Sequence, residues 1–359
     1  MRRLMRLAAM AAVILSAGEV FAADVTIGVV APLTGPSARL GAQVKIGAEA
    51  AAATMQPAPA LEIVDDACTT EGGAAAADRL VTAKVSVAVG FLCTESIEAA
   101  MPILKGAGIP VITVAVRTNS LTDKKEKTGW PVFRLAPRGD QEGAAVSKIL
   151  IGLWRDALFA IIDDGTIYGR ELAETLRSEA ERAGLSPVYV DQFRPQLDNQ
   201  RALVGRLRKA GATHVFVGGD LEDIAVLGRD AASAGYDLTI AGSEALRSAA
   251  FDVPLQQGTL MIGIPEWADL ATPAALAAIK AKGAEPEGYA LPAYVAVEIA
   301  ARAVADAQAS GATVIDSIGN GQFDTALGRI AFDLKGDLQP SPYRLFRFDG
   351  KKFVEAADE

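Results

Sequence analysis

Short runs of consecutive apolar residues, many of them β-branched, recur along the chain with amphipathic stretches between them. Among the runs are VTIGVV, LEIV, VSVAVG, PVITV, ALFAIID, PVYVDQF, HVFVGG and DLTIAG. Because they are continuous rather than alternating, they predict parallel strands covered on both faces. The stretches between them, such as GRELAETLRSEAERAG, have helical periodicity, and several end at a glycine (Gly184, Gly211, Gly235). The alternation predicts an α/β chain with right-handed crossovers.

The alternation is interrupted at three places, which we interpret as crossings between two lobes. They are WPVFRLAPRGDQEGAA, GTLMIGIPEWAD and TALGRIAFD. The helix-rich segment after the second crossing has no strands of its own and needs the first sheet to cover. We therefore expect lobe one to contain residues 23–137 and 267–328, and lobe two residues 138–266 and 329–359. The predicted fold is two doubly wound parallel-sheet lobes joined by three crossing strands, with a ligand cleft between them.

The N-terminal 22 residues have the pattern of a secretory signal peptide. MRRLMR supplies positive charge, LAAMAAVILSAG is a short apolar run, and VFA offers small residues before a cut after Ala22. No later segment reaches about 18 uninterrupted apolar residues. We expect export to the periplasm and no stable membrane insertion.

The charge balance argues against polyanionic partners. The formal net charge is −9, and loss of the signal peptide, with three arginines against one glutamate, takes it to −11. A chain this acidic is repelled by nucleic acid and by anionic lipid. We expect neither as a partner.

The two cysteines, Cys68 and Cys93, are expected to pair as a disulfide, because an exported chain meets an oxidising compartment. A free Cys93 nucleophile is the weaker alternative. Zinc would need four ligands, and the single histidine, His214, lies far away in an apolar run. Neither an activated nucleophile nor a metal cluster is evident, so we expect no enzyme activity, no metal and no cofactor.

The turns that follow the predicted strands are rich in hydroxyl groups and glycines, and they lead into helices. Helix starts with Ser or Thr hydroxyl groups can donate to a carboxylate. Asp220 and Glu244 follow strands of lobe two and could bind an ammonium group. Together these features indicate a site for a zwitterion.

Several characteristic stretches lie in order along nearly the whole mature chain. They include IGVVAPLTGPSARLGAQVKIGAEAA, GFLCTES, ITVAVRTNSLTD, DDGTIYGRELAE and GRIAFDLKGDLQPSPYRLFRFDGKKF. Together they resemble the periplasmic leucine/isoleucine/valine-binding proteins of ABC importers. The paired cysteines fall where that family has its lobe-one disulfide. The resemblance implies a type I periplasmic binding protein that closes on its ligand like a Venus flytrap.

Some residues match the family's ligand-binding positions and others depart from them. Thr94 stands for a serine that binds the ligand carboxylate, Tyr168 lines the cleft on lobe two, and Glu244 matches the acid that binds the ammonium. The departures are Leu40 for an aromatic residue, Asp220 for a tyrosine and Arg117 for a threonine, with Val116 offering only its backbone.

The departures leave the ligand open. Arg117 and Asp220 could pair across the closed cleft around a small aliphatic amino acid. Alternatively, Arg117 could bind a carboxylate of a ligand that lacks the α-amino group, or it could face solvent. We expect a solute receptor that delivers a small amino acid or related carboxylate to ABC permease subunits. The alternatives are a solute sensor of the same fold and a receptor for an aromatic or dicarboxylic acid.

Overall fold

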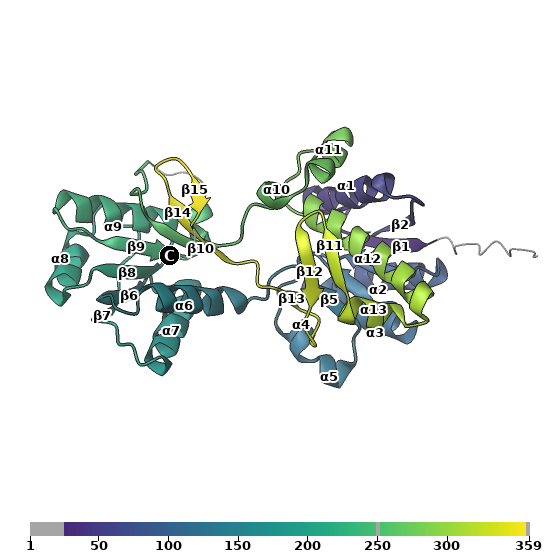
Figure 1. Ribbon diagram of the computed structural model, residues 1–359, viewed down its shortest axis with the longest axis horizontal. Helices are drawn as coiled ribbons and strands as arrows, with labels where there is room; N and C mark the ends of the chain where they lie inside the picture. The colour runs from purple at the N-terminus through teal and green to yellow at the C-terminus, as the bar shows by residue number, and fades with distance from the viewer. Residues whose placement is uncertain (1–24, 249–251, 357–359) are drawn as a thin grey trace, which may run out of the picture.

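The computed structural model describes residues 25–248 and 252–356, so the predicted signal peptide lies outside the described residues. Two lobes lie at opposite ends of the long axis, and three segments of chain pass between them (Figure 1). Each lobe has its own sheet with helices on both faces. The predicted two-lobed α/β fold is confirmed.

Lobe one is built on a five-stranded sheet in the order β2-β1-β3-β4-β5, and all its pairings are parallel. The strands are β1 (Thr26–Ala31), β2 (Ala60–Asp65), β3 (Val87–Gly90), β4 (Val111–Thr113) and β5 (Val132–Arg134). All residues of β3, β4 and β5 are buried. Burial on both faces explains why these segments are continuous apolar runs rather than alternating ones.

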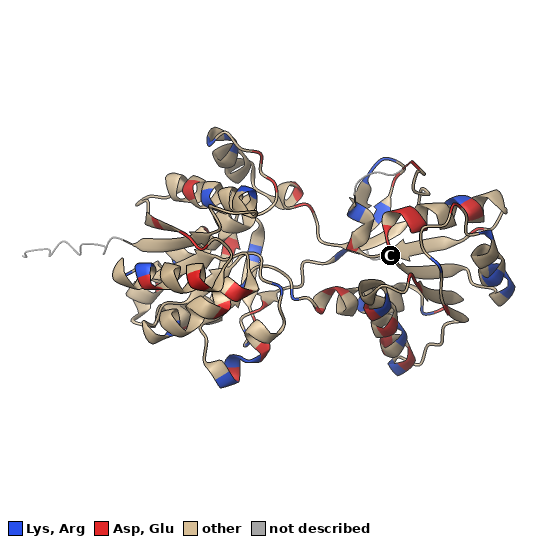
Figure 2. Cartoon of the chain, turned by 180° about the vertical axis from the view of Figure 1, so that it is seen from behind, with Lys and Arg blue, Asp and Glu red and all other residues tan. Residues whose placement is uncertain are grey.

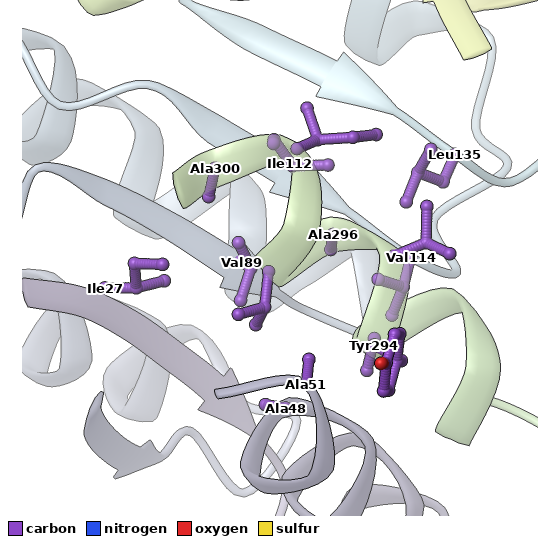
Figure 3. Packing of buried hydrophobic residues seen from close by; sticks show 14 of the residues in the cluster. Ile27, Ala48, Ala51, Val89, Ile112, Val114, Leu135, Tyr294, Ala296 and Ala300 are labelled. Atoms are coloured by element: carbon purple, nitrogen blue, oxygen red, sulfur yellow. The ribbon is translucent and has the colours of Figure 1, made fainter. Parts of the chain in front are cut away.

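Helices cover both faces of this sheet. They are α1 (Ala38–Thr54), α2 (Thr70–Thr82), α3 (Thr94–Gly106), α4 (Ser120–Asp123), α5 (Lys125–Thr128), α10 (Trp267–Leu270), α11 (Pro273–Ala281), α12 (Ala290–Ser310) and α13 (Val314–Asn320). On one face, small residues of α1 and α12 pack on strand residues such as Val89 and Ile112 (Figure 3). The two helices approach so closely that a Cβ on Gly47 would lie 2.0 Å from the Ala290 carbonyl oxygen. The alanine-rich stretches are therefore the contact between these helices.

Lobe two has a seven-stranded sheet in the order β15-β14-β10-β9-β8-β6-β7. Its strands are β6 (Phe159–Asp163), β7 (Tyr189–Gln192), β8 (His214–Gly218), β9 (Thr239–Gly242), β10 (Leu260–Gly263), β14 (Arg344–Phe348) and β15 (Phe353–Glu355). The pairings from β7 through β10 are parallel, and those of β14 and β15 are antiparallel. The tail strands thus return to lobe two.

Within the described residues of lobe two, four helices and one short 3-10 helix accompany this sheet. They are α6 (Gln141–Leu153), α7 (Ile167–Arg182), α8 (Arg201–Ala210), α9 (Leu221–Ser233) and η1 (Glu244–Arg247). Buried residues of α6 and α7 pack together on one face, and those of α8 and α9 on the other. The predicted helix stop at Gly211 has φ 75° and closes α8.

The third crossing lies further along the chain than predicted. A small antiparallel sheet, β11 (Gln322–Thr325), β12 (Gly328–Phe332) and β13 (Leu338–Gln339), follows α13. Its Phe332 joins the lobe-one core, with its ring centroid 5.3 Å from that of Phe133. Placing residue 329 at the start of lobe two was therefore wrong. Chain segments 135–140, 264–266 and 340–343 connect the lobes.

Candidate functional site

The disulfide between Cys68 and Cys93 ties the end of β2 to the start of α3. Beside it, the buried Asp66 accepts hydrogen bonds from the Cys68 amide at 3.2 Å and from Ser96 Oγ at 2.5 Å. These bonds hold the first turn of α3 in place. Cys93 is thus half of a cross-link beside the strand ends, and the expected pairing is confirmed.

Two threonine hydroxyl groups meet on lobe one directly after this cross-link. Thr94, the first residue of α3, lies with its Oγ1 2.7 Å from Oγ1 of Thr118. Both side chains are partly exposed. Thr118 follows β4, so two neighbouring strand ends place these hydroxyl groups side by side.

Arg117, next to Thr118, is exposed, and its Nη2 donates to the Tyr343 hydroxyl group at 2.6 Å. Tyr343 lies in the third crossing and is buried in the lobe-two core. Arg117 therefore bonds across the junction between the lobes. The preceding Val116 packs in the core, and its amide and carbonyl bond to Thr113 and Arg134. Its backbone is thus already engaged within lobe one.

On lobe two, Tyr168, Ser243, Glu244 and Glu142 form one hydrogen-bonded group. The Tyr168 hydroxyl group donates to Glu142 Oε1 at 2.7 Å and lies 2.9 Å from Ser243 Oγ. The Glu244 amide donates to the same Glu142 oxygen at 3.1 Å. Tyr168 starts α7, Ser243 and Glu244 follow β9, and Glu142 lies in the first turn of α6. We call these four residues the lobe-two acidic group.

Two carboxylates in this group lie close enough to influence each other. Burial raises the pKa of Glu244, the neighbouring Glu142 raises it further, and Arg117 and Arg247 lower it. Burial and Glu142 also raise the pKa values of Tyr168 and Tyr343, which keeps both phenols neutral. Glu142 itself is only 6% exposed. The arrangement favours a positively charged ligand group beside the two carboxylates.

Arg117 and Asp220 do not pair in the described structure. Asp220 is instead the N-cap of α9, and its carboxylate accepts from the Asp223 amide at 3.0 Å. Leu40 lies in the first turn of α1 with its side chain 42% exposed. The structure brings together Arg117 with Thr94 and Thr118 on lobe one, and Tyr168 with Glu244 on lobe two.

Sequence reasoning missed Glu142, Thr118, Ser243 and Tyr343. Glu142 follows the first crossing directly, and an acid in the first turn of a helix there was a usable signal. Thr118 and Ser243 each lie one residue from a predicted site residue. Tyr343 lies at the end of a crossing whose position was predicted wrongly, so no pattern placed it at the junction.

A groove of about 1610 Å³ starts at residues 117–119 and runs along α6 and α7. Its lining mixes basic and acidic side chains. Basic and acidic positions are likewise interspersed along the chain in both lobes (Figure 2). Glu142, Tyr168 and Glu244 do not line it. Within the lobe-two acidic group, Glu142 and Ser243 are buried and Tyr168 is 42% exposed, so the group is only partly open to solvent.

Other classes of site find no support in residues 25–248 and 252–356. These residues include no group of three or more His, Cys, Asp or Glu side chains that could hold a metal ion. Within the same part of the chain, no helix combines the length and apolar character needed to cross a bilayer.

Comparisons with known proteins identify relatives that span nearly the whole chain. A Leu/Ile/Val-binding protein homologue of Brucella melitensis is 30% identical over 92% of this chain and 93% of its own length. A leucine-, isoleucine-, valine-, threonine- and alanine-binding protein of Pseudomonas aeruginosa is 27% identical over 97% of this chain and 96% of its own.

Solved structures show the same architecture. An ABC transporter substrate-binding protein from Desulfitobacterium hafniense in complex with leucine has a TM-score of 0.63 at 21% identity, over 92% of this chain and 99% of its own. A solute-binding protein from Rhodopseudomonas palustris in complex with p-hydroxybenzoic acid has a TM-score of 0.59 at 18% identity, over 92% of this chain and 95% of its own.

The family described as "Periplasmic binding protein" matches residues 24–352, which is most of the chain. It is a family of solute-binding receptors rather than enzymes. The structure has two lobes built on parallel strands. It also has a cross-link beside the strand ends and polar groups at the junction between the lobes. The chain belongs to the periplasmic binding protein family.

Proposed function

We propose that this protein is an extracytoplasmic receptor for a small aliphatic amino acid, which it delivers to the permease subunits of an ABC importer. The observation that carries the proposal is the lobe-two acidic group, with Glu142 and Glu244 sharing one hydrogen-bond network. On lobe one, Arg117 and the Thr94–Thr118 hydroxyl pair provide donors. A ligand with one ammonium group and one carboxylate complements both walls.

The ammonium group is the more demanding half of this match. Two nearby carboxylates, one of them buried, are costly unless a cation compensates them. A ligand ammonium group beside Glu244 supplies that charge. An aromatic or dicarboxylic acid supplies none and adds a further negative charge. The p-hydroxybenzoic acid complex of a distant structural neighbour keeps this class as the second candidate, but the acidic group favours an amino acid.

The ligand carboxylate is assigned to lobe one. Arg117 uses its Nη2 toward Tyr343, and its guanidinium group has further N–H donors that can bind a carboxylate. Thr94 adds a hydroxyl group at the start of α3, where the helix dipole favours an anion. The names of the relatives, which include leucine, isoleucine, valine, threonine and alanine, support a small side chain.

Binding would then bring the two lobes together. The described crossings are short segments without helices or strands, and a hinge at these segments would bring the two walls onto the ligand. The closed form is the one we expect the permease subunits to recognise. The signal-peptide pattern and the family support the periplasm as the proposed site of action.

A ligand screen on the purified mature protein tests the proposal. Leucine, isoleucine, valine, alanine and threonine are compared with p-hydroxybenzoate and succinate by thermal shift. A ligand at 1,000 times its dissociation constant stabilises by about 4 kcal/mol, which gives a shift of several degrees. Stabilisation by an aliphatic amino acid supports the proposal. Stabilisation by the carboxylates alone contradicts it.

The role of the acid is tested separately with Glu244→Gln. We expect the affinity for the best amino acid in the screen to fall more than tenfold, or about 1.4 kcal/mol. Glu181→Gln, at an exposed position of α7 in the same lobe, is the matched control. Equal affinities of wild type and Glu244→Gln by calorimetry would remove Glu244 from the site.

A further inference from the structure

A completely buried arginine, Arg134, ends β5 just before the first crossing. Its five N–H donors make five hydrogen bonds, so each donor has a partner. Nε and Nη2 both donate to Asp337 Oδ1, at 2.8 and 2.6 Å, and Nη2 also donates to Thr122 Oγ1. Nη1 donates to the carbonyl oxygens of Val116 at 3.2 Å and Thr118 at 2.8 Å.

Asp337, the carboxylate partner, is also buried, and both of its carboxylate oxygens accept hydrogen bonds. Its Oδ1 accepts twice from Arg134, and its Oδ2 accepts from Thr122 Oγ1 at 3.0 Å and Arg138 Nη1 at 3.1 Å. The Arg134 amide also donates to the Gly336 carbonyl at 2.8 Å. Asp337 immediately precedes β13, after which the third crossing begins. The ion pair therefore links two segments of the chain, one just before the first crossing and one just before the third.

The two carbonyl groups that Arg134 holds flank Arg117. Fixing the carbonyls of Val116 and Thr118 fixes the backbone on both sides of Arg117. It also sets the position of Thr118, whose hydroxyl group lies against that of Thr94. All the lobe-one groups that we assign to the ligand carboxylate thus lie on, or contact, a loop held by one guanidinium group.

A purely stabilising role does not account for this geometry. Replacing a buried ion pair by apolar residues of similar volume is often neutral for stability. The site is suited to such residues, since Leu121, Val132 and Phe133 nearby are all buried. The two hydrogen bonds to the loop carbonyls are what an apolar pair cannot reproduce.

We propose that Arg134 and Asp337 are positioning residues, which hold the loop at 116–122 in its binding geometry and connect it to the first and third crossings. Neither residue contacts the ligand in this proposal. It rests on the amino-acid-binding function proposed above. Movement at the crossings on lobe closure would be transmitted to Arg117 through this pair.

The test compares three variants with wild type. Arg134→Lys keeps the charge opposite Asp337 but cannot reach both loop carbonyls. The double variant Arg134→Met/Asp337→Leu removes the charges together and avoids leaving one of them unpaired. Arg302→Ala breaks an exposed ion pair on α12 of the same lobe and is the control.

Each variant is measured for melting temperature, hydrogen exchange and leucine affinity. The amides of residues 121–123, which donate to the carbonyls of Thr118 and Asn119, report the order of the loop. In Arg134→Lys and in the double variant, we expect these amides to exchange at least tenfold faster than in wild type, while amides of α12 are unchanged. We expect leucine to bind about ten- to a hundredfold more weakly.

The readouts separate this proposal from the proposed function. If wild type binds none of the amino acids, the function fails, and loop exchange still decides the positioning role. Unchanged loop exchange in folded Arg134→Lys overturns the proposal. So does faster exchange with wild-type leucine affinity. If the double variant does not fold, Arg134→Lys alone gives the result.

Discussion

Asp223 provides a sharp test of the electrostatics of lobe two. Its carboxyl group is 2% exposed; Oδ1 accepts from the Gln196 amide at 2.8 Å, and Oδ2 has no hydrogen-bond partner among the described residues. Burial is the main reason that the pKa of Asp223 is raised, to about 6. The hydrogen bond from Gln196 lowers this pKa, and the negative charges of Asp220 and other acids raise it. We predict that Asp223→Asn stabilises the protein at neutral pH.

The pH dependence follows from the direction of the shift. Between an unfolded pKa of 3.8 and a folded pKa of about 6, the folded protein keeps a proton that the unfolded chain has lost. Stability therefore falls as pH rises through this window, and the cost is complete above it. A tenfold change in an acid constant corresponds to about 1.4 kcal/mol, so the full shift corresponds to about 3 kcal/mol. Asp223 lines a cavity of about 340 Å³, and solvent screening there reduces the expected cost to roughly 1–2 kcal/mol.

Urea unfolding of wild type and Asp223→Asn at a series of pH values measures this difference. We expect the variant to be more stable by roughly 1–2 kcal/mol at pH 7.5. The difference should shrink as pH falls and vanish below the unfolded pKa of 3.8. Asp78→Asn, at an exposed position of α2, controls for the substitution itself. A stability difference that is zero at pH 7.5, or that grows as pH falls, would refute the reasoning.

Three further predictions concern the binding walls. Replacing Cys68 and Cys93 by serine should lower the free energy of unfolding by about 3.5 kcal/mol, because the disulfide closes a loop of 25 residues. Urea unfolding measures this loss, and a loss below about 1 kcal/mol would contradict the prediction. Thr94→Val should weaken leucine binding by about 1–3 kcal/mol in calorimetry, because a ligand carboxylate oxygen loses its donor, and unchanged affinity would remove Thr94 from the site. Leucine affinity should fall as pH drops through the raised pKa of Glu244, because binding then requires this carboxyl group to release its proton. Calorimetry at acidic pH in buffers of different ionisation enthalpy would detect the released protons. Identical heats of binding in all buffers would argue against this role of Glu244.

The sequence predicted the strands well because burial on both faces leaves a direct trace in composition. VTIGVV covers all of β1 except Ala31, and VSVAVG contains β3; the residues of both strands are almost all buried. The third crossing was misplaced for the converse reason. Ile330 and Phe332 show that a strand buries one face, but nothing in GRIAF says which lobe covers it. That choice is made by contacts such as Phe332 with Phe133, nearly two hundred residues away.

Some residues of the candidate site could likewise be predicted from the sequence, and others could not. Thr94, Tyr168 and Glu244 were predicted because they follow strands and match positions of a known family. Glu142 was not, although it bonds to both Tyr168 and Glu244. An acid in the first turn of a helix is common, since it stabilises the helix dipole wherever it lies. Only the fold shows that this turn lies against η1 and the start of α7.

The distribution of charge gives a reason why ligand binding and lobe closure should be linked. On lobe two, two carboxylates share a partly buried network, and Arg117 of lobe one lowers the pKa of Glu244 more than Arg247 does. In the described structure Arg117 also bonds to Tyr343. Closing without ligand would bury these carboxylates further while leaving their charge excess in place. A zwitterion supplies an ammonium group to the carboxylates and a carboxylate to Arg117, so it removes the electrostatic cost of closure on both walls. A ligand can shift the open–closed equilibrium only by its difference in affinity for the two forms. Contacts made simultaneously with Glu244 and with Arg117 provide that difference, because only the closed form makes both.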